Sequence, residues 1–340
     1  ADRSTSMLWA TGVRQARQPL ARAAAASAAC RPFSSDVPAP VKTVGVVGLG
    51  LMGHGIAQAA ATAGMAVTGV ERENAALELG QSRIETSVDR ILGKQVAKGK
   101  LDQGAADAEA ARIRGNLRYD TDIASIANCD LVIEAIVEDM AIKVPFWNQL
   151  GKLCKPDAIF ASNTSSLPIT AQAEASGRAD RFVGLHFFNP VQLMRLVEVI
   201  ATEHTSEDTF TQAKAWAARL PDKVVVSCKD TPGFIVNRLL VPNIAQALAM
   251  LDRGDASVQD IDVAMKLGAG HPMGPVALAD YVGLDTTCSI LKGWVQAFPS
   301  EPAFFVPKCL EAKVRQGHLG RKSGKGFYIW DGDKPTQVAP

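Results

Sequence analysis

The sequence lacks any apolar run as long as the roughly 20 residues that a membrane-spanning helix needs. It also lacks an excess of charge of either sign, since 36 lysines and arginines stand against 35 aspartates and glutamates. This balance argues against a globally basic surface for nucleic acid or an acidic membrane, so any anion must be recognised locally. We therefore expect no nucleic-acid partner and no stable membrane insertion.

Cysteine is sparse and scattered. The six cysteines form no Cys-x-x-Cys pair, and no histidines cluster at the spacing of metal ligands. We predict reduced thiols in a compartment that is not oxidising, and no metal site.

Acidic residues are missing from residues 7–35, which contain four arginines, many alanines and several serines. This composition is typical of a mitochondrial presequence, and Arg31-Pro32-Phe33-Ser34 resembles a matrix-protease cleavage site. We predict a disordered presequence over residues 1–40 and a location in the mitochondrial matrix. A disordered tail without a targeting role is the alternative, and residues 1–6 are unexplained.

The chain has 340 residues, which is more than one hydrophobic core usually supports, so two domains are expected. From residue 41, apolar runs of strand length alternate with segments of helical period, which predicts an α/β Rossmann-type domain over residues 41–230. The expected strands are 43–47, 66–70, 131–135, 158–161, 182–187, 196–200 and 224–228. A helical insertion is expected at about 75–112, with a break near Gly99.

Strand-like runs vanish after residue 230. We predict an all-helical C-terminal domain over residues 231–330, followed by a tail over 331–340. The expected helices are 234–253, 258–266, 276–298 and 303–316.

A glycine-rich turn follows the first expected strand. Gly48-Leu49-Gly50-Leu51-Met52-Gly53 opens an apolar helix, and Glu71 ends the next strand. Glycines let the backbone approach a dinucleotide pyrophosphate, and the acid can bind the ribose hydroxyls and repel a 2′-phosphate. This pattern favours NAD, although Arg72 leaves strict discrimination against NADP open. A tight turn with an incidental acid is the alternative.

A histidine and a carboxylate lie on neighbouring apolar strands. His186 precedes a turn that contains Asn189-Pro190, and Glu198 lies on the following strand. A carboxylate beside an imidazole fixes its tautomer and stabilises the imidazolium, so the pair suits a general base. Ser162-Asn163-Thr164-Ser165-Ser166 adds hydroxyl and amide groups at a strand end, although a helix-capping loop has the same composition. A base together with a cofactor site suggests a dehydrogenase.

These features and several further segments resemble the L-3-hydroxyacyl-CoA dehydrogenase family of the mitochondrial short- and medium-chain type, over residues 42–328. The further segments are Glu134-Ala135-Ile136-Val137-Glu138, Gly184-Leu185-His186-Phe187-Phe188-Asn189-Pro190, Lys229-Asp230-Thr231-Pro232-Gly233-Phe234-Ile235-Val236-Asn237-Arg238 and Gly283-Leu284-Asp285-Thr286.

The resemblance implies NAD-dependent oxidation of L-3-hydroxyacyl-CoA to 3-ketoacyl-CoA in fatty-acid β-oxidation. It implies that His186 is the base, that Glu198 orients it, and that Ser165 and Asn237 bind the reacting oxygen. It also implies a homodimer, with the helical domain capping the cofactor cleft. The implied cofactor contacts are Gly48, Gly50, Leu51, Met52, Gly53, Glu71, Glu138, Lys143, Ser165, Asn189 and Lys322. The implied contacts to the CoA substrate are Ser87, Lys94 and Ser165.

Two features depart from the family pattern. The glycine turn also looks like that of the 3-hydroxyisobutyrate and 6-phosphogluconate dehydrogenases, and Glu71 stands where the family more often has aspartate. A dehydrogenase of free hydroxy acids and a catalytically idle NAD-binding protein remain as alternatives. Acyl-chain length and the direction of flux are not predicted.

Overall fold

The structure is a computed structural model that describes residues 41–339. The predicted presequence lies outside these residues. Within them, none of the helices combines the length and the apolar character needed to traverse a lipid bilayer.

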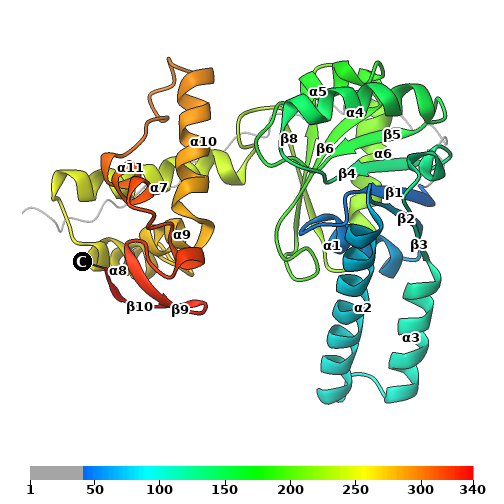
Figure 1. Cartoon of the computed structure of the whole chain (residues 1–340), viewed down its shortest axis with the longest axis horizontal. Helices are drawn as coiled ribbons and strands as arrows, with labels where there is room; N and C mark the ends of the chain where they lie inside the picture. Colours follow the sequence, from blue (N-terminus) through cyan, green and yellow to red (C-terminus); the bar gives the residue numbers. More distant parts are fainter. Residues whose placement is uncertain (1–40, 340) are drawn as a thin grey trace, which may run out of the picture. The chain divides into compact units, whose positions relative to one another are not determined.

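One eight-stranded sheet organises the first part of the chain (Figure 1), in the order β3-β2-β1-β4-β5-β6-β7-β8. Neighbouring strands are parallel except β6 and β7, which are antiparallel. The strands are β1 (Thr43–Val47), β2 (Ala66–Val70), β3 (Leu117–Asp120), β4 (Leu131–Glu134), β5 (Ile159–Ser162), β6 (Phe182–Phe187), β7 (Leu196–Ala201) and β8 (Val224–Lys229). The Rossmann-type sheet that the sequence predicted is confirmed.

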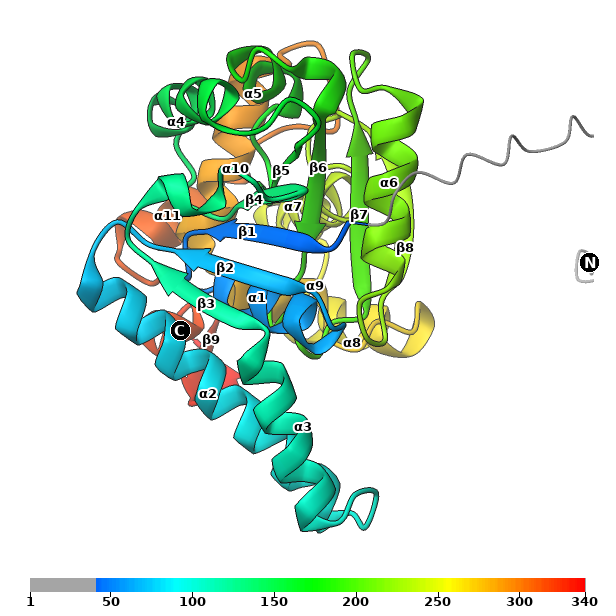
Figure 2. The same cartoon turned by 90° about the vertical axis from the view of Figure 1, so that its right-hand side faces the viewer.

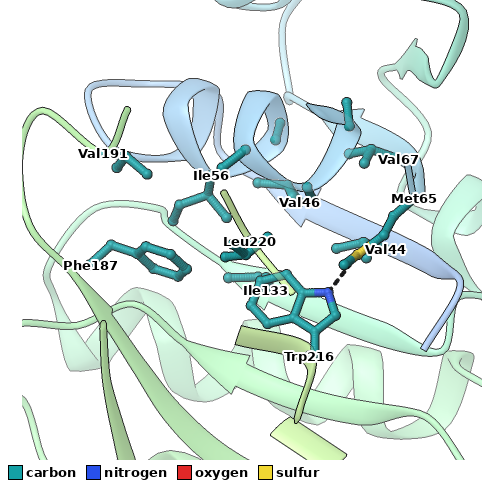
Figure 3. Packing of buried hydrophobic residues seen from close by; sticks show 14 of the residues in the cluster. Val44, Val46, Ile56, Met65, Val67, Ile133, Phe187, Val191, Trp216 and Leu220 are labelled. Atoms are coloured by element: carbon teal, nitrogen blue, oxygen red, sulfur yellow. Dashed lines mark hydrogen bonds between the residues drawn. The ribbon is translucent and has the colours of Figure 1, made fainter. Parts of the chain in front are cut away.

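Helices cover both faces of this sheet. Alternate residues of each strand point to opposite faces, so apolar side chains on both faces are buried under helices. On β1, Val46 packs in a core with α1 (Gly53–Thr62) and α6 (Glu207–Ala218). Val47 instead packs in a core with α4 (Met140–Leu153) and α5 (Ile169–Ala175). Figure 3 shows the first core, where the Trp216 indole N–H lies 2.9 Å from the Met65 sulfur.

The predicted helical insertion is present as α2 (Asn74–Ala97) and α3 (Gln103–Gly115). The two helices run alongside each other and extend beyond the sheet (Figure 2). The sequence analysis missed β3, which pairs with β2 at the edge of the sheet. Its four residues, Leu-Arg-Tyr-Asp, are not fully buried and contain no apolar run, so hydrophobic patterning gives no signal there.

The second part of the chain has a hydrophobic core of its own. Its helices are α7 (Val236–Arg253), α8 (Val258–Gly268), α9 (Pro275–Val282), α10 (Leu284–Ala297) and α11 (Lys308–Arg315). The sequence predicted one helix over 276–298, and this was wrong. Gly283 has a φ of 109°, which a right-handed helix cannot contain, and it separates α9 from α10.

The last residues form a hairpin where the sequence predicted a tail. Strands β9 (Tyr328–Asp331) and β10 (Lys334–Val338) pair in antiparallel orientation on either side of Gly332. The residues of β10 are exposed and include a proline, so nothing in their pattern indicated a strand. The C-terminal part is therefore helical with one small hairpin.

Candidate active site

The predicted histidine and carboxylate face each other across the antiparallel pair of the sheet. The register sets His186 on β6 directly opposite Glu198 on β7, which brings the two side chains to the same face. The imidazole Nδ1 lies 2.6 Å from Glu198 Oε2. Because a carboxylate only accepts, Nδ1 carries the hydrogen, and the lone pair of neutral His186 is on Nε2.

The other oxygen of Glu198 lies at the start of α7. Glu198 Oε1 accepts the backbone N–H groups of Ile235 (3.1 Å) and Val236 (2.9 Å). The carboxylate is fully buried, and these donors together with the imidazole satisfy both of its oxygens. It therefore holds the first turn of α7 and the histidine in one fixed arrangement.

Two aromatic rings pack beside the His186 imidazole. The ring of Phe188 has its centroid 4.5 Å away, and that of Phe234 5.5 Å away. Phe234 has a φ of 56°, a left-handed conformation that is costly for an aromatic residue. Sequence reasoning quoted both phenylalanines within motifs but gave neither a role.

The glycine-rich turn joins β1 to α1 through close backbone contacts. A Cβ on Gly48 would lie 2.6 Å from the carbonyl oxygen of Ala135, and one on Gly53 would lie 1.6 Å from that of Gly48. Gly50 has no atom within 4 Å of its Cβ position, so its backbone is open to a ligand. Glu71 accepts the N–H of Leu49 at 2.6 Å and is thereby fixed beside the turn. These residues fit a dinucleotide pyrophosphate and ribose.

One cavity of about 740 Å³ brings most of the predicted site together. Its walls include the glycine turn, the acid after β2, the histidine and the loop after β5. The predicted residues that line it are Gly48, Gly50, Leu51, Met52, Glu71, Glu138, Lys143, Ser165, His186, Asn189 and Asn237. Gly53 and Glu198 do not line it: Gly53 is packed against the backbone of Gly48, and Glu198 is bonded to the His186 ring.

Lys143, a predicted cofactor contact, lies in the cavity wall between two acids. Only 1% of its side chain is exposed, and its ammonium lies 2.8 Å from Glu138 and 3.0 Å from Glu134. Ser165 and Asn237 lie near each other, with the Asn237 amide nitrogen 3.4 Å from the Ser165 carbonyl oxygen.

Besides Gly53 and Glu198, three predicted residues do not line this cavity. Lys322 follows Gly320 in the helical part, and its ammonium pairs with Asp285 at 2.6 Å. Ser87 and Lys94 lie seven residues apart on α2, so they share a face of the helix. Ser87 is buried with no hydrogen-bond partner for its hydroxyl, and Lys94 is exposed.

Sequence reasoning missed one buried acid of this site. Glu134, the last residue of β4, lines the cavity and is fully buried. The sequence analysis quoted it in a segment that resembles the family but gave it no role, although it is an acid that ends the apolar run Leu-Val-Ile. Burial raises the pKa of the Glu134 carboxyl, although the Lys143 ammonium opposes this.

Comparison with known proteins decides the family. The model of the 3-hydroxyacyl-CoA dehydrogenase NAD-binding domain matches residues 43–231, and that of the family's C-terminal domain matches residues 233–330. The chain belongs to the 3-hydroxyacyl-CoA dehydrogenase family. It is an NAD-dependent oxidoreductase, as predicted, and its cofactor is NAD.

Individual relatives agree with this assignment. The enzyme is 49% identical over 289 residues to the mitochondrial hydroxyacyl-coenzyme A dehydrogenase of Rattus norvegicus, covering 85% of this chain and 91% of the relative. It is 47% identical to the human mitochondrial protein of that name, with the same coverage. Among solved structures, (S)-3-hydroxybutyryl-CoA dehydrogenase PaaH1 from Ralstonia eutropha has a TM-score of 0.80 at 40% identity, covering 86% of this chain and 99% of that one. FadB2 of M. tuberculosis has a TM-score of 0.78 at 41% identity, covering 86% and 100%.

Proposed function

We propose that the enzyme oxidises L-3-hydroxyacyl-CoA to 3-ketoacyl-CoA, with His186 as the general base. The main support is that the His186–Glu198 pair, 2.6 Å apart, lies at the same cavity as the glycine turn. A base and a dinucleotide site in one cavity are what hydride transfer from an alcohol requires. The family membership supplies the class of substrate.

In this proposal His186 Nε2 accepts the proton of the 3-hydroxyl while the carbonyl forms. Bound NAD supplies the acceptor for the hydride that leaves C3. The Glu198 carboxylate keeps the imidazole in the required tautomer and stabilises its positive charge after proton transfer. Ser165 and Asn237 lie close enough together to bind the reacting oxygen from one side.

For the rest of the substrate, we propose that Ser87 and Lys94 bind the CoA portion. Support comes from their shared face on α2 and from the exposed ammonium of Lys94, which suits a phosphate. Glu71, Asn189 and Lys322 are proposed cofactor contacts. To bind the cofactor, Lys322 would exchange its ion pair with Asp285 for a contact with the dinucleotide.

We further propose a mitochondrial matrix enzyme of fatty-acid β-oxidation that acts as a homodimer. Support for the location comes from the printed names of the rat and human relatives and from the arginine-rich, acid-free residues 7–35. A protease-protection assay on isolated mitochondria tests import of the full chain. Recovery of all the protein outside the organelle would contradict it.

The decisive experiment follows NADH oxidation by the full chain with acetoacetyl-CoA and with longer 3-ketoacyl-CoAs. We expect turnover with the thioesters and little with free acetoacetate. Equal turnover of thioester and free acid would favour a dehydrogenase of free hydroxy acids. NADH binding without turnover of either would favour the catalytically idle protein.

A further inference from the structure

The carboxylate of Glu134 is fully buried beside the cavity and has three hydrogen-bonding partners. It accepts the Ser162 hydroxyl at 2.7 Å, the Ile136 backbone N–H at 2.9 Å and the Lys143 ammonium at 3.0 Å. The proposed function gives this carboxylate no role, since it assigns roles only to the base, to the acid that orients it and to the residues that bind substrate and cofactor. An isolated ionised carboxylate in such a place is costly, so its set of partners requires an explanation.

Lys143 links Glu134 to a second acid, Glu138. The lysine, a residue of α4, is buried, and its ammonium spans two acids, reaching both oxygens of Glu134 and one of Glu138. A buried ammonium needs such compensation. Because its donors already have these partners, Lys143 fixes the position of Glu138 rather than reaching into solvent.

Glu138 in turn holds the loop that follows β5. Its Oε1 accepts the backbone N–H of Ser165 at 3.0 Å and also the Thr164 hydroxyl. Burial opposes ionisation of Glu138, but the Lys143 ammonium and these donors lower its pKa below the ordinary value. An ionised Glu138 therefore binds the backbone of the residue proposed to contact the reacting oxygen.

The same loop has two further attachments. Ser162, which donates to Glu134, also accepts the Thr164 backbone N–H at 3.2 Å. The Asn163 side-chain oxygen accepts the N–H of Phe187, the residue after His186, at 3.0 Å. The network of Glu134 thus reaches the backbone beside the base.

We propose that Glu134 is a positioning residue that aligns Ser165 with His186 through the Lys143–Glu138 ion pair and Ser162. The proposal rests on the proposed function of His186 and Ser165. Glu134 acts through other residues, so its loss displaces reacting groups instead of removing one. Misplacement by about 1 Å can cost about a hundredfold in rate.

The test is Glu134→Gln in the full chain. The amide keeps the size of the side chain and can still accept from Ser162, but its NH₂ cannot compensate the Lys143 ammonium. We expect kcat with acetoacetyl-CoA to fall at least about tenfold while KM changes less than about threefold. We also expect NADH to bind several-fold more weakly in a fluorescence titration without substrate, because Glu138 lines the cofactor cavity. Glu134→Asp keeps the charge and should recover part of kcat.

Asp130→Asn is the matched control. Asp130 directly precedes β4 at its opposite end, and its carboxylate pairs with Lys155 at 2.6 Å. Because this pair is remote from the cavity, the control should lose stability while kcat and NADH affinity stay within about twofold of wild type. A folded Glu134→Gln with kinetics as little changed as those of the control would overturn the proposal.

A second variant tests the proposal if Glu134→Gln does not fold. Glu134→Gln with Lys143→Met removes the uncompensated ammonium together with its partner, yet still cuts the link to Glu138. Slow turnover by this variant at saturating NADH, where a weakened cofactor contact no longer limits the rate, supports the proposal, and near-normal turnover overturns it. Wild-type activity on 3-ketoacyl-CoA tests the proposed function separately, and NADH binding by Glu134→Gln is measured without a substrate. The two claims can therefore fail independently.

Discussion

Replacing Glu198 by glutamine tests how the carboxylate controls the base. The acid is fully buried and binds the His186 Nδ1 and two backbone N–H groups. A glutamine can accept the two N–H groups through its oxygen, but its NH₂ then faces Nδ1. This contact favours the tautomer with the hydrogen on Nε2, where the lone pair is needed. The carboxylate also no longer stabilises the imidazolium.

We expect kcat of Glu198→Gln to fall about ten-thousandfold, as for a catalytic histidine held in the wrong tautomer. We also expect a loss of about 1–3 kcal/mol in the free energy of unfolding, since the start of α7 loses charge-assisted hydrogen bonds.

The assay measures NADH formation from 3-hydroxybutyryl-CoA between acidic and neutral pH, with unfolding followed by circular dichroism. A variant that stays folded and turns over within about threefold of wild type would refute the tautomer argument. A loss in stability without a loss in kcat would mean that the carboxylate serves only the fold.

Two further predictions concern the CoA site and the fold. If Lys94 faces a CoA phosphate as proposed, Lys94→Ala should raise KM for acetoacetyl-CoA about tenfold and leave turnover of free acetoacetate unchanged. Equal effects on both substrates would contradict a role for Lys94 in binding CoA. For Asp130, burial alone would raise the pKa, but the Lys155 ammonium and the backbone N–H groups of Lys42 and Thr43 lower it to about 2. Asp130→Asn should therefore cost about 1 kcal/mol at neutral pH, after allowance for solvent screening, and the cost should shrink as pH falls from about 4 through about 2. A cost that is independent of pH in urea titrations would contradict this.

The sign of the Asp130 effect follows from linkage. A carboxyl whose pKa is lowered on folding stabilises the folded state above its unfolded pKa, and this contribution is lost on protonation.

Much of the fold could be predicted because its strands are buried on both faces. Thr43–Val47 and Phe182–Phe187 read as apolar runs, and these positions agree with the strands of the structure. The half-exposed β3 and the exposed β10 have no such run, so they were missed. The break at Gly283 was missed because a glycine within an apolar helical pattern does not by itself reveal its φ.

For the site, the sequence predicted the contact between His186 and Glu198, because two neighbouring strands each carried one chemically distinctive residue. It did not predict how Lys143 is used. The ammonium pairs with Glu134 and Glu138, and only the position of α4 beside the end of β4 brings these three groups together. Such networks depend on tertiary contacts that local patterns do not encode.

The most direct test of the central claim is the comparison of kcat and NADH affinity in His186→Gln. If His186 Nε2 is the base, kcat should fall by at least about a hundredfold while the dissociation constant of NADH stays within about twofold of wild type. Turnover at the wild-type rate by this variant would contradict the account.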